Sequence, residues 1–347
     1  MEVVQPPATA GSSGCINCNH PVIVKGYPNA LCESCRENFI KFPIPKSIIL
    51  FAAAIGIIFL FSIYKIPKDI LLGIHLDKGN TALQQRRYLT AQKELQKVVD
   101  KVPDDIEAKS NLLIAAFYNE DFTTFSKMFS QLTGKNYDDM ELYNRVDNAV
   151  KEADNYFPND SFISLQHRYN NDATKIPDTV LKNYISQNRG ELYPAMLLAN
   201  RLLDAKALDA ADSVINNILM VNPSHIPALA MMAVLKREED KTDESLAYCD
   251  RVLAINKESV YALSAKARTY MKQKKDAEAL SLALSCHQMD ENNYYATGTL
   301  ILAYHFTNKL KERDGLLNTM SLLKDSASVQ TIQYVRDVIS GKEIFRN

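Results

Sequence analysis

Tryptophan is absent from this sequence, and glycine is scarce, with 11 glycines among 347 residues. All-β folds and phosphate-binding loops need tight turns, which glycine supplies because it adopts backbone conformations that other residues avoid. The scarcity of glycine therefore argues against both and favours helices. An excess of positive charge is also lacking: 40 basic and 41 acidic residues leave a net charge of −1, which argues against nucleic acid as a partner.

The short motifs that mark common enzyme classes are missing as well. The sequence has no Gly-x-x-x-x-Gly-Lys-Ser/Thr loop, no Gly-x-Gly-x-x-Gly turn, no Gly-x-Ser-x-Gly elbow and no His-Glu-x-x-His helix. Its six histidines are scattered, and none stands near a cysteine or aspartate in a pattern that suggests a nucleophile. We therefore predict a non-enzymatic protein without a small-molecule substrate.

Cysteine is concentrated near the N-terminus, where four of the six cysteines stand. Cys15 and Cys18 form one Cys-x-x-Cys pair, and Cys32 and Cys35 form a second pair after thirteen intervening residues. Two such pairs complete the tetrahedral set of four thiolates that Zn²⁺ prefers, with no open position for a substrate. We therefore predict that residues 15–42 are a zinc module whose structural metal supplies most of the folding energy.

The module resembles zinc-ribbon and treble-clef modules. Between the cysteine pairs the sequence predicts a hairpin, with a strand at residues 22–24 and a turn at residues 25–28, and a helix is expected after the second pair. A rubredoxin-like iron site and two disulfides are the alternatives. Iron sites favour proline and glycine beside each pair, whereas Asn19 and Arg36 stand there. His20 is a further candidate ligand, which we interpret as a solvated loop residue.

One long apolar run, SIILFAAAIGIIFLFSIY at residues 47–64, contains no charged residue. As a helix, its 18 residues span about 27 Å, close to the roughly 30 Å hydrocarbon core of a bilayer. Lysines flank the run on both sides, and Tyr64 stands where an interfacial aromatic residue is expected. We predict a retained single-pass transmembrane helix, with a buried core helix as the alternative. Residues 1–14 predict a flexible tail without a cleavable signal peptide.

Residues 68–347 show helical periodicity, and the sequence repeats there with a period of about 34 residues. Small residues recur where two helices must approach closely, at Ala199, Ala233 and Ala267. Apolar residues recur at the end of each second helix, at Ile218, Val252, Cys286 and Met320. This pattern resembles the tetratricopeptide repeat family. The resemblance implies an all-α solenoid, in which each helix pair buries one face against its neighbour.

The resemblance places repeats near 72–105, 192–225, 226–259, 260–293 and 294–327. It is weaker in the last repeat, where Ile301 and Arg313 replace the expected small residues. Residues 106–191 predict divergent helices, because the signature is lost there and the phase slips by roughly half of the period after residue 140. The segment SVQTIQYVRDVI predicts a capping helix at the C-terminal end. A generic all-α array outside this family is the alternative.

The resemblance also implies that the first helix of each pair lines a concave groove for a protein or peptide. The groove residues that follow from it are Tyr193, Asn200, Arg237, Tyr261, Arg268, Tyr295 and His305. Tyrosine offers a large contact area at low entropic cost, which suits peptide binding, although the same tyrosines could instead pack between repeats. The Lys/Asn/Arg carboxylate clamp of some family members is not predicted, because its paired lysines are absent.

Positive charge does not determine the membrane orientation. Three basic residues precede the apolar run and three follow it within the roughly 15–20 residues of each end over which charge sets the orientation. Thiolates keep a metal best in a reducing compartment, which favours a cytoplasmic N-terminus and an extracytoplasmic repeat domain. We therefore predict a membrane-anchored scaffold for an unidentified protein partner. The alternative is a membrane signalling protein whose zinc module binds a cytoplasmic partner or nucleic acid. A third option is an accessory subunit of a secretion or quality-control machine.

Overall fold

The protein is described from a computed structural model that covers residues 14–41, 45–323 and 325–346, without the side chains of residues 40, 41 and 62–69. The chain divides into two compact units, Met1–Leu71 and Leu72–Asn347. Within the described residues there are 17 α-helices, two short 3₁₀-helices and no β-strand, so the all-α prediction is confirmed. The predicted flexible tail lies outside the described residues apart from Gly14.

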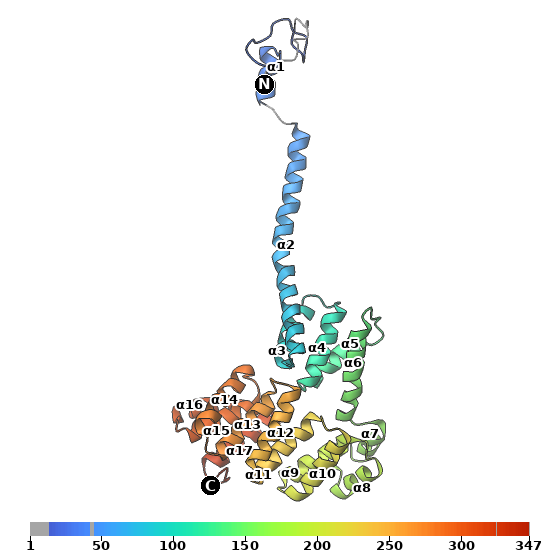
Figure 1. Ribbon diagram of the computed structural model, residues 1–347, viewed down its shortest axis with the longest axis vertical. Coiled ribbons are helices and arrows are strands. Elements are labelled where there is room, and N and C mark those ends of the chain that lie inside the picture. Colours follow the sequence, from blue (N-terminus) through green and yellow to red (C-terminus); the bar gives the residue numbers. More distant parts are fainter. Residues whose placement is uncertain (1–13, 42–44, 324, 347) are drawn as a thin grey trace, which may run out of the picture. The chain divides into compact units, whose positions relative to one another are not determined.

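The first unit contains α1 (Glu33–Lys41) and the beginning of α2 (Lys46–Gln84). A helix was expected after the second cysteine pair, and α1 begins one residue after Cys32, so that Cys35 lies within it (Figure 1). The predicted hairpin is wrong, because residues 21–31 form bends and irregular backbone rather than strands. One backbone hydrogen bond joins the two expected strands, from Val24 N to Leu31 O at 2.9 Å. A single bond of this kind does not make a β-ladder.

Helix α2 carries the apolar run of the sequence. Its large apolar side chains from Ile48 to Leu60 are each more than half exposed. Within the part of the chain that the structure describes, no helix is both long enough and apolar enough to cross a membrane. The side chains of residues 62–64, the last three of the predicted span, lie outside that part.

The C-terminal part of the second unit consists of helix pairs in strict register. The first helices are α9 (Leu192–Asp204), α11 (Ile226–Glu238), α13 (Val260–Lys272) and α15 (Tyr294–Phe306), and each begins one full period of the repeat after the last. The second helices follow the same spacing and are α10 (Leu208–Val221), α12 (Thr242–Ile255), α14 (Asp276–Met289) and α16 (Leu310–Met320). Small residues stand where the helices cross, since Ala199, Ala233 and Ala267 are almost fully buried.

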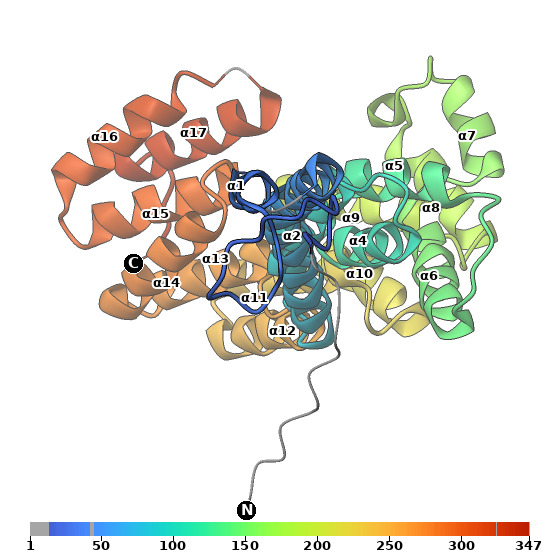
Figure 2. The same ribbon diagram turned by 90° about the horizontal axis from the view of Figure 1, so that it is seen from above.

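The N-terminal part of the second unit begins with two further pairs, the end of α2 with α3 (Tyr88–Val99) and α4 (Ile106–Tyr118) with α5 (Phe122–Leu132). The helices that follow leave the period. They are α6 (Met140–Ala153), η1 (Asp154–Tyr156), α7 (Asp160–His167), η2 (Ala173–Lys175) and α8 (Asp178–Gln187). Figure 2 shows α7 and the C-terminal helices α16 and α17 (Ser326–Ile339) at opposite ends of this unit.

The turn within each regular helix pair has one backbone conformation throughout the unit. Six non-glycine residues with φ between 54° and 59° hold these turns: Arg86, Glu120, Lys206, Asp240, Lys274 and Asn308. In each turn the next N–H group bonds the carbonyl five residues back, as in Lys275 N to Tyr270 O at 2.9 Å, which closes a Schellman motif. Successive turns stand one period apart, with one exception. Glu120 and Lys206 are separated by about two and a half periods, because the irregular helices lie between them.

Helix α17 covers the end of the array by packing on α15. Val335 of α17 is fully buried in this contact. The close approach depends on Gly298 in α15, because a Cβ atom there would lie 2.5 Å from Cγ2 of Thr331. The capping helix expected from the sequence thus closes the apolar end of the solenoid.

The N-terminal pairs also contact the edge of the C-terminal pairs, which the repeat pattern did not indicate. Arg86 donates from Nη1 to Ala254 O at 2.7 Å, and its backbone carbonyl oxygen accepts from Lys257 N at 2.9 Å. Thr90 donates from its backbone N and its hydroxyl to the carboxylate of Glu258, at 2.8 and 2.7 Å.

A second joint between distant segments is formed by Tyr156 of η1 and His225 before α11. Their rings stack at 4.5 Å, and Tyr156 Oη accepts from Ile226 N at 3.3 Å. His225 is fully buried and caps α11, since its Nδ1 accepts from Ala228 N at 3.3 Å. Burial lowers the pKa of His225 to about 4. The imidazole is therefore neutral in the folded protein at physiological pH.

Replacing Lys274 by glycine should stabilise the protein by about 0.5–1 kcal/mol, because glycine adopts positive φ without the steric cost that a side chain incurs. The matched control is Lys311→Gly, an exposed position inside α16, which should cost about 1 kcal/mol. Urea unfolding of the full chain measures both changes. Equal losses of stability in the two variants would contradict the left-handed turn.

The buried His225 predicts acid sensitivity. Its pKa is lowered in the folded state, so below pH 6.5 the unfolded chain binds a proton that the folded chain does not, and stability falls with pH by up to about 3 kcal/mol at pH 4. His225→Asn retains a helix-capping side chain without a titratable ring, so its unfolding free energy should depend less on pH between 6.5 and 4. Identical pH profiles for variant and wild type would refute the assignment.

Candidate functional site

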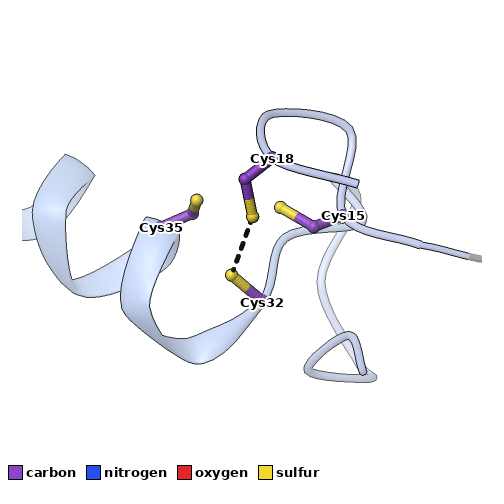
Figure 3. A group of neighbouring side chains, drawn as sticks. All are labelled: Cys15, Cys18, Cys32 and Cys35. Atoms are coloured by element: carbon purple, nitrogen blue, oxygen red, sulfur yellow. Dashed lines mark hydrogen bonds between the residues drawn. The ribbon is translucent and has the colours of Figure 1, made fainter. Parts of the chain in front are cut away.

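The four N-terminal cysteines form one cluster, and their side chains converge (Figure 3). All four Sγ atoms lie within 4.8 Å of one another, and those of Cys18 and Cys32 are 3.6 Å apart. A tetrahedral zinc site with Zn–S bonds of about 2.3 Å places its sulfurs about 3.8 Å apart, whereas a disulfide requires about 2.05 Å. The spacing therefore fits a single metal ion such as zinc better than two disulfides.

Hydrogen bonds to sulfur prepare this cluster for a cation. Burial by itself raises the pKa of Cys15, but the backbone N–H groups of Cys32, Asn17 and Cys18 lower it to about 6. Asn17 also donates from Nδ2 to Cys35 Sγ at 3.3 Å. The backbone N–H of His20 lowers the pKa of Cys18, but the three neighbouring thiols raise it to about 12. Four thiolates this close need a central cation to offset their repulsion.

The residues around the cluster contribute little to its stability. Two partly buried apolar side chains, Ile23 and Leu31, pack against the cysteines in the described part of the module. The His20 side chain is exposed and lies outside the cluster, where its Nδ1 accepts from Val22 N at 3.2 Å. The donor set is therefore four sulfurs, which leaves a tetrahedral ion no open position.

A cavity of about 490 Å³ lies in the second unit, on the first helices of the C-terminal pairs. Its walls include Arg237 of α11, Tyr261 and Arg268 of α13, Tyr295 of α15 and Tyr334 of α17. Four of the seven predicted groove residues thus lie together. They converge because their helices repeat with the same period and present the same face.

The other three predicted groove residues do not line this cavity. Tyr193 packs edge-on against Phe162, with ring centroids 5.6 Å apart, because α7 and α8 fill the space beside α9. Asn200 is exposed. His305 pairs with Arg313, whose Nη1 lies 3.2 Å from the ring Nδ1.

The tyrosines of the cavity both line it and pack between repeats. Tyr261 and Tyr295 stack at 4.5 Å with an interplanar angle of 14°. The guanidinium of Arg268 lies 4.0 Å above the Tyr295 ring, in cation–π contact. Tyr261 and Tyr295 therefore line the cavity and also pack between neighbouring repeats.

Both arginines that line the cavity are unusually buried, with Arg237 4% and Arg268 5% exposed. Arg237 donates from Nε and Nη2 to Glu238 Oε1 at 3.1 and 2.9 Å. Burial alone would lower the pKa of Arg237, but Tyr295 and Glu238 outweigh it and raise the pKa. Arg268 donates from Nε to Thr299 Oγ1 at 2.8 Å. Arg237 is therefore held in its charged form.

The C-terminal segment forms one side of the cavity, which the sequence pattern missed. Glu343 pairs with Lys206 at 2.8 Å, and Ile344 lines the cavity beside it. Phe345 is 4% exposed and packs against Phe306. These residues follow the last repeat, so no periodic signal marks them; only the alternation of charged and bulky apolar residues could have suggested a packed segment.

No protein-family model matches the chain, and no curated protein matches it. Solved structures with some similarity include YrrB, described as a TPR protein with an unusual peptide-binding site, with a TM-score of 0.31, 15% identity, and coverage of 47% of this chain and 82% of YrrB. Yeast Tom70 has a TM-score of 0.35 and 15% identity, over 73% of this chain and 60% of Tom70. MamA has a TM-score of 0.33 and 12% identity, over 60% of this chain and 98% of MamA. Similarity this low assigns no function to the chain.

The cysteine cluster predicts about one zinc ion per full-length chain. Cys18→Ser and Cys32→Ser should each lower the bound zinc severalfold, because three sulfurs leave the tetrahedron incomplete. Cys249→Ser is the matched control, since burial raises the pKa of this repeat-domain thiol to about 11 and should leave zinc content unchanged. Elemental analysis by mass spectrometry measures the metal. Bound iron, or two disulfides without metal, would overturn the zinc assignment.

Proposed function

We propose that this protein is a non-enzymatic scaffold that binds another protein through the cavity of its second unit. The observation that carries the proposal is the grouping of two buried arginines with three tyrosines on the first helices of the C-terminal pairs and on α17. Arginine and tyrosine are the side chains that most often dominate binding energy at the centres of protein interfaces. A cavity of this size, partly walled by charged groups, suits a peptide segment.

The four-cysteine cluster supports a structural role for zinc in the N-terminal module. In this proposal the ion ties the two Cys-x-x-Cys pairs together and substitutes for a hydrophobic core. Arg36 of the module lies 3.6 Å above the Tyr27 ring and donates to Asn29 O at 3.1 Å. Because this arginine is engaged within the module, a nucleic-acid-binding role for the module gains no support.

We also propose that α2 anchors the protein as a single-pass membrane protein, with the module in the cytoplasm and the repeat domain outside it. The support is the charge-free run at residues 47–64 and the exposure of its apolar side chains, which would be unfavourable in water. Carbonate extraction of membranes tests the anchor. Labelling of a cysteine introduced at Asn292, an exposed position, tests the orientation in intact cells.

The scaffold proposal predicts that blocking the cavity removes a specific partner. Val234 lines the cavity and is partly exposed, so Val234→Glu adds bulk and charge without opening the core. Affinity capture with the full chain should recover the partner at least tenfold less well with this variant. Val329→Glu, on the exposed side of α17, is the matched control and should behave as wild type. Equal recovery by both variants would place the binding surface elsewhere.

A further inference from the structure

The second unit has another cavity, which lies where the end of α8, the beginning of α9 and the end of α10 meet. Its volume is about 480 Å³. Helix α8 ends at Gln187, one period before the end of α10 at Val221, so α8 and α10 both hold the position of a second helix. This cavity shares no lining residue with the cavity on the first helices. The two are therefore separate sites.

The interior of this second-helix cavity is apolar. Leu192, Leu198 and Ile218 line it and are each at most 2% exposed, and the partly buried Ile185 and Val214 lie among the same lining residues. Protein interiors are close-packed and leave few voids larger than a water molecule. Sites for small ligands, in contrast, are mostly apolar clefts of about 300–1,000 Å³. The second-helix cavity has the size and the lining of such a site.

The next helix pair shows how the same space is filled elsewhere in the array. Leu229 and Tyr248 stand one period after Ala195 and Val214, which line the cavity. Leu229 is 1% exposed and belongs to an apolar cluster against which Tyr248 packs. The smaller side chains of Ala195 and Val214 leave this space open. The cavity therefore arises from the residues of this pair and not from the geometry that all pairs share.

Positive charge borders the cavity. Lys182 and Arg189 line it and are exposed, and neither side chain forms an ion pair or a hydrogen bond with another described residue. One acidic residue, Glu191, also lines the cavity, and its carboxylate accepts from Tyr184 Oη at 2.7 Å. Two basic groups against one acidic group leave the lining positive, which favours an anionic ligand over a cationic one.

The apolar surface here is inside the cavity and is not spread along the helices. Between residues 178 and 293 the exposed large apolar side chains are those of Met220 and Val221, and both line the cavity. A partner helix needs apolar contacts along two turns, at positions i, i+3, i+4 and i+7. A surface without such a strip favours a narrow apolar chain that enters the cavity.

We propose that the second-helix cavity binds a single alkyl chain with a carboxylate head group, as in a fatty acid. The chain lies against Leu192, Leu198 and Ile218, where each methylene group removed from water tightens binding about fourfold. The carboxylate lies at the rim, where Lys182 and Arg189 supply donors for charge-assisted hydrogen bonds. The proposal goes beyond the scaffold function, because it concerns a separate cavity and needs no protein partner.

The test has to resolve the site, because the apolar run of α2 also offers a surface to alkyl chains. The full-length protein is irradiated with a dodecanoate that carries a photoreactive diazirine at the end of its chain, and labelled peptides are identified by mass spectrometry. Adducts should appear in peptides that contain residues 182–198 and 214–221. Unlabelled dodecanoate should compete about tenfold better for these adducts than dodecyltrimethylammonium, which has the same chain length and the opposite charge.

Filling the cavity tests its apolar part. Ala195→Leu combined with Val214→Tyr introduces the side chains of the next pair. Labelling of the cavity should fall about tenfold, labelling of α2 should stay the same, and the melting temperature should not fall, because apolar space is filled. Ala210→Leu, at an exposed position of α10, is the matched control and should label as the wild type does.

Removing the rim charges tests the head group. Lys182→Gln combined with Arg189→Gln should remove the preference for dodecanoate over dodecyltrimethylammonium, while adducts in the cavity remain. Lys127→Gln, an exposed lysine of α5, is the matched control and should retain the preference.

Three results would overturn the proposal: adducts confined to α2, equal competition by the two amphiphiles in the wild type, and undiminished labelling of the filled variant. If the filled variant does not fold, the competition in the wild type still decides. A protein that is captured by the wild type and lost from the filled variant, without adducts in the wild-type cavity, would assign the cavity to a protein segment instead. Val234→Glu leaves this cavity intact and should label as the wild type does, so the scaffold proposal can fail separately.

Discussion

Each helix pair of the second unit can bury its apolar face only against the next pair, and this constraint organises the rest of the structure. The alanines at the helix crossings, such as Ala233 and Ala267, let the helices approach closely enough to exclude water. Left-handed turns such as those at Asp240 and Lys274 set the same geometry within each pair. Because crossings and turns recur with the same period, equivalent side chains of successive first helices stand in one row and form the cavity wall.

The same constraint explains why the two ends of the unit need contacts of another kind. An array of pairs leaves an apolar face at its end, and α17 covers that face on α15 through the close approach at Gly298. The early pairs contact the turns of later ones through Arg86 and Thr90, and the irregular helices do so through Tyr156. These contacts join segments far apart in sequence, so they tie non-adjacent helix pairs together, whereas the regular stacking joins only neighbouring pairs.

The cavity of the second unit contains two nearly buried arginines, and the C-terminal segment that follows α17 forms one of its walls. Arg237 and Arg268 are nearly buried, and cation–π contact and neighbouring oxygens replace part of their hydration. The C-terminal segment adds Glu343 at the edge without reaching the unpartnered guanidinium atoms. Buried donor atoms without a partner lower the stability of the folded protein.

The local features of this protein could be predicted from its sequence, since they arise from residues close together in the chain. The helix pairs follow from apolar periodicity, and the cysteine cluster follows from two Cys-x-x-Cys pairs, whose spacing brings four sulfurs within reach of one ion. The zinc-module hairpin was predicted wrongly, because a short β-branched run does not by itself form paired strands, and residues 21–31 form bends and irregular backbone instead. Of the groove residues, those in the regular repeats lie together, whereas Tyr193 packs against the irregular helices.

The sequence by itself thus determined the all-α class, the period of the helix pairs and the identity of the clustered thiols. The tertiary structure alone decided which arginines are buried and keep a nitrogen without a hydrogen-bond partner, and that the C-terminal segment forms a wall of the cavity. The physical reason is that periodicity reports which face of a helix is apolar. It does not report which distant segment covers that face, because such packing depends on the shapes of surfaces formed only after the pairs have stacked.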